Sequence, residues 1–146
     1  MFKLQNVFWA LLLITAIPLF TGCSGDSSQA KGDLPTRVDA LIREDRYEEA
    51  IELIKDEGDG HEKEDLLLEK TYLNYALFLE YRAEDQDMRE RMTGALELFI
   101  KVLEVNPGNE KALGEIKQIM GVYKTLPNRQ PPQEILDKLD KMGISY

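Results

Sequence analysis

The chain has 146 residues, 31% of them charged, and a formal net charge of −9 at pH 7. This length predicts one small domain that buries around two-thirds of its unfolded surface. The excess of acidic side chains repels phosphate backbones, so nucleic acid is not an expected partner. Since the chain has one cysteine and one histidine, few groups remain for nucleophilic or metal-assisted chemistry. We expect no enzyme activity, no cofactor and no metal.

The amino-terminal segment is typical of a secretory signal. Lys3 supplies a positive charge, and an apolar run of 14 residues follows from Val7 to Phe20. A membrane-spanning helix needs roughly 20 apolar residues, so this run is too short to cross the bilayer. Pro18 would also disturb its last helical turn. The sequence therefore predicts that residues 1–22 form a signal peptide that is removed.

The apolar run ends in a motif that contains the only cysteine, Leu19-Phe20-Thr21-Gly22-Cys23. This motif resembles the processing site of bacterial lipoprotein precursors, in which a small residue precedes an acylated cysteine. The resemblance implies cleavage after Gly22 and lipidation of Cys23. Two or more acyl chains suffice as an anchor, because each buried methylene adds about 0.8 kcal/mol. The alternative is an ordinary signal peptide or signal anchor in which Cys23 has no role.

The residues after the cysteine indicate a tether. Ser24 to Lys31 are small and polar, and no periodic apolar pattern begins before Leu34. We assign residues 23–32 to the lipidated cysteine and its flexible tether, and residues 33–146 to the folded domain. In enterobacterial lipoproteins an aspartate after the cysteine favours the inner membrane. The lipoprotein resemblance, with Ser24 there, thus implies a lipid-anchored cell-envelope protein, with the outer membrane facing the periplasm favoured over the inner membrane.

From Leu34 onward apolar residues recur at helical spacing, and the breaks fall at glycine, proline or acidic clusters. The pattern predicts an all-α fold with Asp33 and Asp87 as helix caps. The third helix is apolar around most of its circumference, which predicts a central position. The six expected helices are about Leu34–Glu44, Arg46–Lys55, Glu64–Arg82, from after Asp87 to before Asn106, Glu110–Tyr123 and Pro132–Met142.

Two segments share a pattern typical of helical repeats. Ala95, Phe99 and Pro107 stand four and then eight residues apart, and this segment resembles the second helix of a tetratricopeptide repeat. Residues 46–54 resemble the same helix, and residues 74–76 resemble the crossing point of a first helix. The resemblance implies antiparallel helical hairpins stacked as a short α-solenoid, with the last helix as a cap. The alternative is plain packing of helical hairpins without repeat geometry.

The repeat resemblance also implies a binding surface. In tetratricopeptide proteins the first helices of successive repeats line a concave groove that receives a peptide or a partner helix. The phase of the motif places ten residues towards that groove: Asp39, Ile42, Arg43, Lys70, Leu73, Leu77, Glu80, Tyr81, Lys111 and Gln118.

Two acidic loops interrupt the helical pattern, and the first does not fit a calcium site. If Gly60 were the turn glycine of a calcium-binding EF-hand loop, Leu66 would stand where the closing glutamate is needed. His61, in the same loop, is expected to be exposed and without a ligand role. The second cluster, Glu84 to Asp87, is explained as a loop and helix cap, and its alternative role is a contact for a basic partner.

These observations predict a membrane-anchored, non-catalytic adaptor of the bacterial cell envelope. Its lipid would hold the chain at the membrane, and its helices would hold an envelope protein or peptide by helix-in-groove or extended-peptide recognition. The alternative function is a carrier of a small hydrophobic ligand or lipid. In that case the helix from Leu66 to Leu79 would line a cavity and not a filled core.

Overall fold

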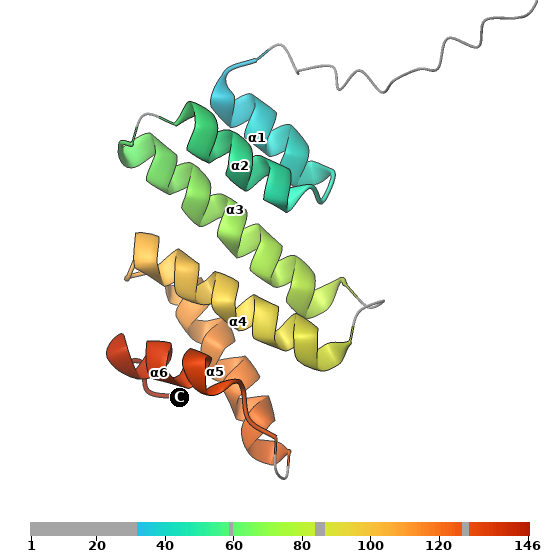
Figure 1. The fold of residues 1–146 in the computed structure, drawn as a ribbon, viewed down its shortest axis with the longest axis vertical. Coiled ribbons are helices and arrows are strands. Elements are labelled where there is room, and N and C mark those ends of the chain that lie inside the picture. Colours follow the sequence, from blue (N-terminus) through green and yellow to red (C-terminus); the bar gives the residue numbers. More distant parts are fainter. Residues whose placement is uncertain (1–31, 59, 84–86, 127–128) are drawn as a thin grey trace, which may run out of the picture.

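The computed structural model describes residues 32–58, 60–83, 87–126 and 129–146, and every regular element in these ranges is an α-helix (Figure 1). This confirms the all-α prediction, and the helix ends differ from the predicted ones by at most two residues. The predicted signal peptide and lipidation site lie outside the described residues. The helices are α1 (Leu34–Arg43), α2 (Tyr47–Glu57), α3 (Glu62–Tyr81), α4 (Met88–Val105), α5 (Glu110–Thr125) and α6 (Gln133–Lys141).

Side-chain caps fix the starts of three helices. The Asp33 carboxylate accepts a hydrogen bond from the backbone N–H of Thr36 at 3.3 Å and starts α1. The Asp87 carboxylate accepts from the backbone N–H of Arg89 at 2.8 Å and starts α4. Asn109 caps α5 in the same way. Both predicted caps are thus confirmed, since each satisfies a backbone donor that the first helical turn leaves unpaired.

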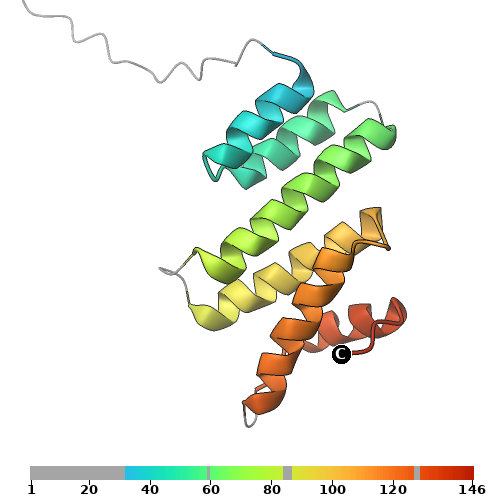
Figure 2. The ribbon, with the colours of Figure 1, turned by 180° about the vertical axis from the view of Figure 1, so that it is seen from behind.

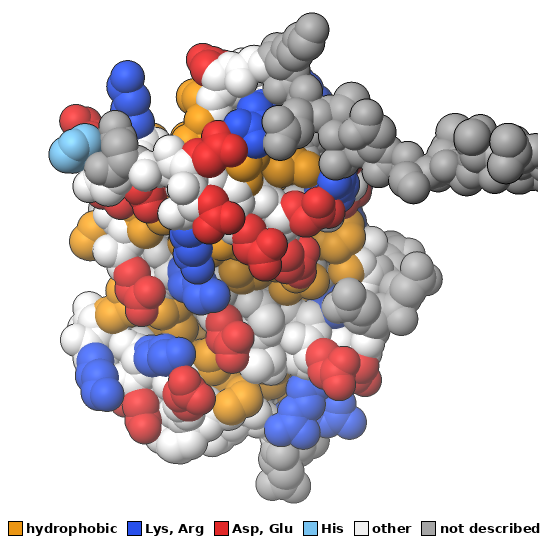
Figure 3. Space-filling view, turned by 45° about the horizontal axis from the view of Figure 1, so that its top comes forward, with side chains coloured by type: hydrophobic (Ala, Val, Ile, Leu, Met, Phe, Trp, Pro, Cys, Tyr) orange, Lys and Arg blue, Asp and Glu red, His pale blue; other side chains and the backbone are white. Residues whose placement is uncertain are grey.

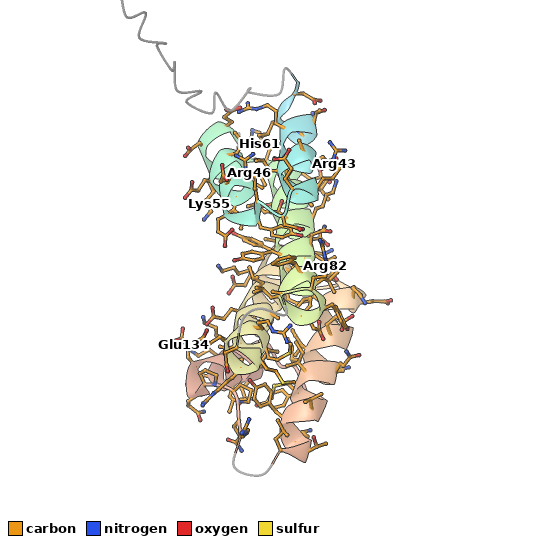
Figure 4. The ribbon with its side chains drawn as sticks, turned by 90° about the vertical axis from the view of Figure 1, so that its right-hand side faces the viewer. Arg43, Arg46, Lys55, His61, Arg82 and Glu134 are labelled. Atoms are coloured by element: carbon orange, nitrogen blue, oxygen red, sulfur yellow. The ribbon has the colours of Figure 1, made fainter. Side chains whose placement is uncertain are left out.

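The six helices lie in two layers. Along the chain α1 packs on α2, α2 on α3, α3 on α4 and α4 on α5, while α1 also contacts α3 and α6 contacts α4. In Figure 2 helix α5 crosses in front of α4 and α6, and α1 lies in front of α2. Figure 4 views the layers edge-on, with α1 and α5 on one side and α2 and α6 on the other. Helices α1, α3 and α5 therefore form one layer, and α2, α4 and α6 form the other.

The larger hydrophobic core is shared by α3, α4, α5 and α6. Helix α4 supplies seven of its buried side chains, and α3 joins this core to the first hairpin because it packs on α1, α2 and α4. The predicted central position of the third helix is thus confirmed. The largest fully buried side chains of this core are Leu96, Phe99, Ile100, Val102, Leu103, Ile116, Ile119, Ile135 and Leu139.

A smaller core lies between α1, α2 and the start of α3. Its buried members are Val38, Ala50 and Ile54, with partly buried side chains such as Leu67 packed against them. Both cores consist of residues between 38 and 139. A fragment of residues 32–146 therefore retains every buried apolar side chain of the described structure.

Small residues lie where α3 and α4 pack closely. Ala76 and Ala95, two positions that carry the repeat resemblance, are fully buried. A Cβ added at Gly94 would lie 3.0 Å from Cδ1 of Leu79, so a larger residue there would force a shift. The small side chains thus let these two helices approach at the density of a protein interior.

Candidate binding face of helices α1, α3 and α5

The ten residues predicted to line a groove all lie on α1, α3 and α5, the helices of one layer (Figure 2). We call this surface the α1/α3/α5 face. Ile42, Leu73 and Leu77 are partly buried and pack against the two cores. Arg43 is exposed, and Figure 4 shows it at the α1 side of the molecule. The six other predicted residues take part in contacts between or along the helices of this face.

One ion pair joins the first two helices of the face. Lys70 Nζ on α3 lies 2.6 Å from Asp39 Oδ1 on α1. Both side chains are about half exposed, so the pair contributes little to stability. The ion pair is informative about geometry, because it shows that polar side chains of α1 and α3 meet on the same side of these helices.

A second set of contacts joins α3 to α5. The Tyr81 hydroxyl donates to Glu115 Oε2 at 2.8 Å. Gln118 Nε2 donates to the Tyr81 oxygen at 2.9 Å and to Glu80 Oε1 at 3.3 Å. Lys111 Nζ is paired with the other carboxylate oxygen of Glu115. We call these five residues the polar cluster, and four of them were predicted from the sequence.

The polar cluster contains two buried carboxyl groups whose pKa values are shifted in opposite directions. Glu80 is 9% exposed, and its Oε2 has no hydrogen-bond partner among the described residues. Burial and the neighbouring Glu115 raise the pKa of Glu80 to about 7. Burial also acts to raise the pKa of Glu115, but hydrogen bonds from Lys111 and Tyr81 outweigh it and lower that pKa. Near neutral pH, Glu80 and not Glu115 therefore takes up a proton.

Glu115 is the functional candidate that the sequence analysis missed. The groove positions were taken from the phase of the repeat motif, which does not include this residue. A different signal was available, since Lys111 and Glu115 stand four residues apart and such oppositely charged pairs share one helix face. Gln118, three residues further on, continues the same stripe.

Figure 3 views the opposite layer obliquely and shows acidic and basic side chains interspersed, with hydrophobic side chains between them. Among the described residues no group of histidine, cysteine, aspartate and glutamate side chains could hold a metal ion. No helix in the described ranges is long and apolar enough to cross a membrane.

The two acidic loops have local structural roles where they are described. His61 is exposed, as predicted, and its backbone carbonyl accepts from the Glu64 N–H at 2.8 Å at the start of α3. In the second cluster Asp87 caps α4, while residues 84–86 lie outside the described ranges, so a contact with a basic partner there stays a prediction.

The carrier alternative requires a cavity along the segment from Leu66 to Leu79. Within this segment Tyr72, Ala76 and Leu79 are buried in the larger core. Three clefts of the described structure, of about 410, 370 and 750 Å³, have no lining residue from this segment. A cavity there stays a prediction that no described cleft supports.

Comparison of the chain with protein-family models gave no match, and comparison with curated proteins and with solved structures gave none either. The case for a function therefore depends on the α1/α3/α5 face and on the motif around Cys23.

Proposed function

We propose that this chain is a membrane-anchored, non-catalytic adaptor of the bacterial cell envelope. In this proposal Cys23 carries the lipid, and the α1/α3/α5 face receives a segment of another envelope protein. The observation that supports it is the division of the helices into two layers, because the ten predicted groove residues all belong to α1, α3 and α5, the helices of one layer.

The packing pattern supports a short solenoid of the tetratricopeptide type. Helix α1 contacts both α2 and α3, and α4 contacts both α5 and α6, as expected where each helix meets its hairpin partner and the next repeat. In this arrangement α1–α2 and α3–α4 are the two repeats, α5 begins a third, and α6 acts as the cap. Small residues at Ala76, Gly94 and Ala95 support the same interpretation.

The chemistry of the face suits protein recognition. Tyr81 is 52% exposed although its hydroxyl is held by Glu115 and Gln118. A tyrosine fixed in this way offers apolar area at a low entropic cost, and tyrosine is enriched among the residues that dominate binding energy. Leu73 and Leu77 lie on the same helix and add apolar surface.

The anchor would determine where this face works. The motif that ends in Cys23 resembles a lipoprotein processing site, and Ser24 favours the outer membrane facing the periplasm over the inner membrane. A lipid and a short polar tether leave the folded domain free to meet proteins near the membrane surface.

The experiment is site-specific photo-crosslinking of the full chain, with its own amino terminus, in a Gram-negative host. A photoreactive phenylalanine replaces Tyr81, which is an exposed aromatic position. Glu52, exposed on α2 in the opposite layer, is the matched control position. We expect defined envelope proteins to be captured from position 81 and not from position 52.

Two results would contradict the proposal separately. Equal capture at positions 81 and 52 would argue against a binding face on α1, α3 and α5. A Cys23→Ser variant should leave the membrane fraction and lose acyl labelling; unchanged membrane attachment would instead overturn the lipoprotein assignment.

A further inference from the structure

A cleft lies between the beginning of α4 and the end of α5, apart from the polar cluster. Its volume of about 410 Å³ is within the range of roughly 300–1,000 Å³ that is usual for small-molecule sites. The apolar part of its lining consists of Met88, Met92, Ile119, Val122, Tyr123 and Leu126.

Two apolar side chains at the rim of the cleft are exposed to solvent. Met88 is 58% exposed and Val122 is 44% exposed, and they stand on the two helices that flank the cleft. Ile119 and Tyr123 behind them are buried. An occupant that covered Met88 and Val122 would gain roughly 25 cal/mol for each Å² of apolar surface removed from water. The body of a fitting ligand is therefore apolar.

Two arginines give the same cleft a positive rim. Arg89 and Arg129 both line it, and neither forms an ion pair or side-chain hydrogen bond with another described residue. Among the described lining residues Asp87 is the one carboxylate, and it already accepts backbone hydrogen bonds as the α4 cap. A planar guanidinium suits a carboxylate, because it can donate two parallel hydrogen bonds. The charge of the rim thus selects an anionic head group.

A neighbouring cleft extends the space for the apolar body. It measures about 750 Å³ and shares Tyr123, Leu126 and Arg129 with the first cleft. The buried hydroxyl of Tyr123 has no hydrogen-bond partner among the described residues. Because Arg129 lines both clefts, a head group held there has apolar surface of either cleft within reach of its chain.

We propose that this cleft binds a free long-chain carboxylate, with its head group at Arg89 and Arg129 and its chain against Met88 and Val122. A docked peptide helix fits less well, because the cleft is confined to the ends of two helices and does not run along them. The proposed site includes none of the ten predicted groove residues, so it does not depend on the adaptor role.

The test uses the full chain in isolated host membranes and a long-chain carboxylate that carries a photoreactive diazirine. After illumination and digestion, mass spectrometry locates the adducts. We expect them on peptides that contain Met88 or Val122, and an excess of dodecanoate should reduce them about tenfold, as expected when the competitor occupies about nine-tenths of the sites. Dodecylamine, with the same chain and the opposite charge, should leave them unchanged.

Matched variants separate the head-group site from the chain site. Val122→Trp fills the cleft from an exposed position and should abolish labelling. The double variant Arg89→Gln and Arg129→Gln should lose the preference for dodecanoate over dodecanol. Lys55→Gln changes an exposed cation on α2, outside both proposed sites, and should behave like the unaltered chain. Circular dichroism of each variant checks that the helices are intact. If Val122→Trp unfolds, Met88→Trp at the other exposed rim position takes its place and should likewise abolish labelling.

Three outcomes would overturn the proposal. Labelling that persists in folded Val122→Trp would place the probe elsewhere, and equal competition by dodecylamine would remove the role of the arginines. Adducts displaced by phosphatidylglycerol vesicles or by a peptide with a free carboxyl terminus, but not by dodecanoate, would assign the cleft to a different class of ligand.

Discussion

The first hairpin and the rest of the domain are held together by different means. The α1–α2 hairpin has a core of three buried residues, whereas α3 to α6 share a cluster of eighteen. Because burial of apolar surface is the main favourable term in folding, the hairpin contributes less stability and should open first. We therefore expect the binding face proposed above to span a more stable and a less stable part of the molecule.

Aromatic and ionic contacts compensate for the small core of the hairpin. Tyr47 at the start of α2 stacks on Tyr75 of α3 with ring centroids 4.9 Å apart, and Phe78 lies 5.4 Å from the same ring. Arg82, at the end of α3, binds both carboxylate oxygens of Asp45 in the α1–α2 turn. These contacts join the hairpin to α3, so a partner that bridges α1 and α3 would stabilise the hairpin further.

Removal of Phe99 should have the largest effect, because it breaks the larger core. Phe99 on α4 is fully buried, and Phe99→Ala should cost about 3–5 kcal/mol of unfolding free energy. Urea unfolding of the 32–146 fragment, followed by circular dichroism, measures this loss. Glu97→Ala, an exposed neighbour on the same helix, should change stability by less than about 0.5 kcal/mol. Equal losses in both variants would show that α4 is not the centre of the core.

Ile54→Ala tests whether the hairpin opens by itself. Ile54 is fully buried in the smaller core, and its truncation should cost about 2–4 kcal/mol. If the hairpin is a separate opening unit, hydrogen exchange of α1 and α2 amides should accelerate roughly 30-fold or more, with little change in α4. Equal acceleration in α4 would mean that both parts unfold as one unit.

The sequence predicted the helices well because their signals are local. Asp33 and Asp87 indicated two helix starts, because aspartate is a favoured N-cap. The apolar periodicity predicted the number of helices and their approximate ends. The unequal sizes of the two cores could not be predicted in this way. The core sizes depend on which apolar helix faces pack against each other in the folded chain, and on how much of the α3 surface is covered by α2 and by α4.

The candidate site was predicted in outline only. The repeat phase placed Glu80, Tyr81, Lys111 and Gln118 on one surface, and the structure brings them together. The repeat phase did not predict that Glu115 would be buried between these residues, because burial of a glutamate depends on the packing of α5 against α3. The cleft at Arg89 and Arg129 had no sequence signal, since its lining combines two helix ends and a following loop.

Glu80 lowers the stability of the α3–α6 part when its carboxyl group is ionised, so its effect on the free energy of unfolding depends on pH. The folded pKa of about 7 is raised from an ordinary value of 4.5, so the folded state holds a proton that the unfolded state releases at lower pH. The stabilisation from Glu80 is complete below about pH 4.5 and is lost as pH rises towards 7. We expect the 32–146 fragment to lose on the order of 1–3 kcal/mol from this group across that window.

Glu80→Gln should remove this dependence, because an amide stays neutral at every pH. The variant should be more stable than the unaltered fragment at pH 8 and close to it at pH 5, as measured by thermal unfolding. Glu52→Gln, an exposed change on α2, should keep the original pH profile. Parallel profiles for Glu80→Gln and the unaltered fragment would show that Glu80 is ionised throughout. Glu115, whose pKa is lowered, acts in the opposite sense and only at more acidic pH.

The smallest expected effect concerns the ion pair that joins the hairpin turn to α3. Arg82 lies 3.0 and 2.9 Å from the two carboxylate oxygens of Asp45, which adopts a left-handed backbone with φ of 58°. Because Arg82 is largely exposed, the pair should contribute under about 1 kcal/mol.

A double-mutant cycle of Arg82→Lys and Asp45→Asn isolates this contribution, since lysine cannot form the two-fold contact and asparagine tolerates the left-handed backbone. The coupling should appear in hydrogen exchange of α1 and α2 and not in that of α4, while Arg43→Lys serves as a control on the same hairpin. A coupling near zero would leave the stack of Tyr47 on Tyr75 as the contact that holds the hairpin to α3. In that case the weaker half of the binding face would be held by aromatic packing, which changes much less with salt than an ion pair does.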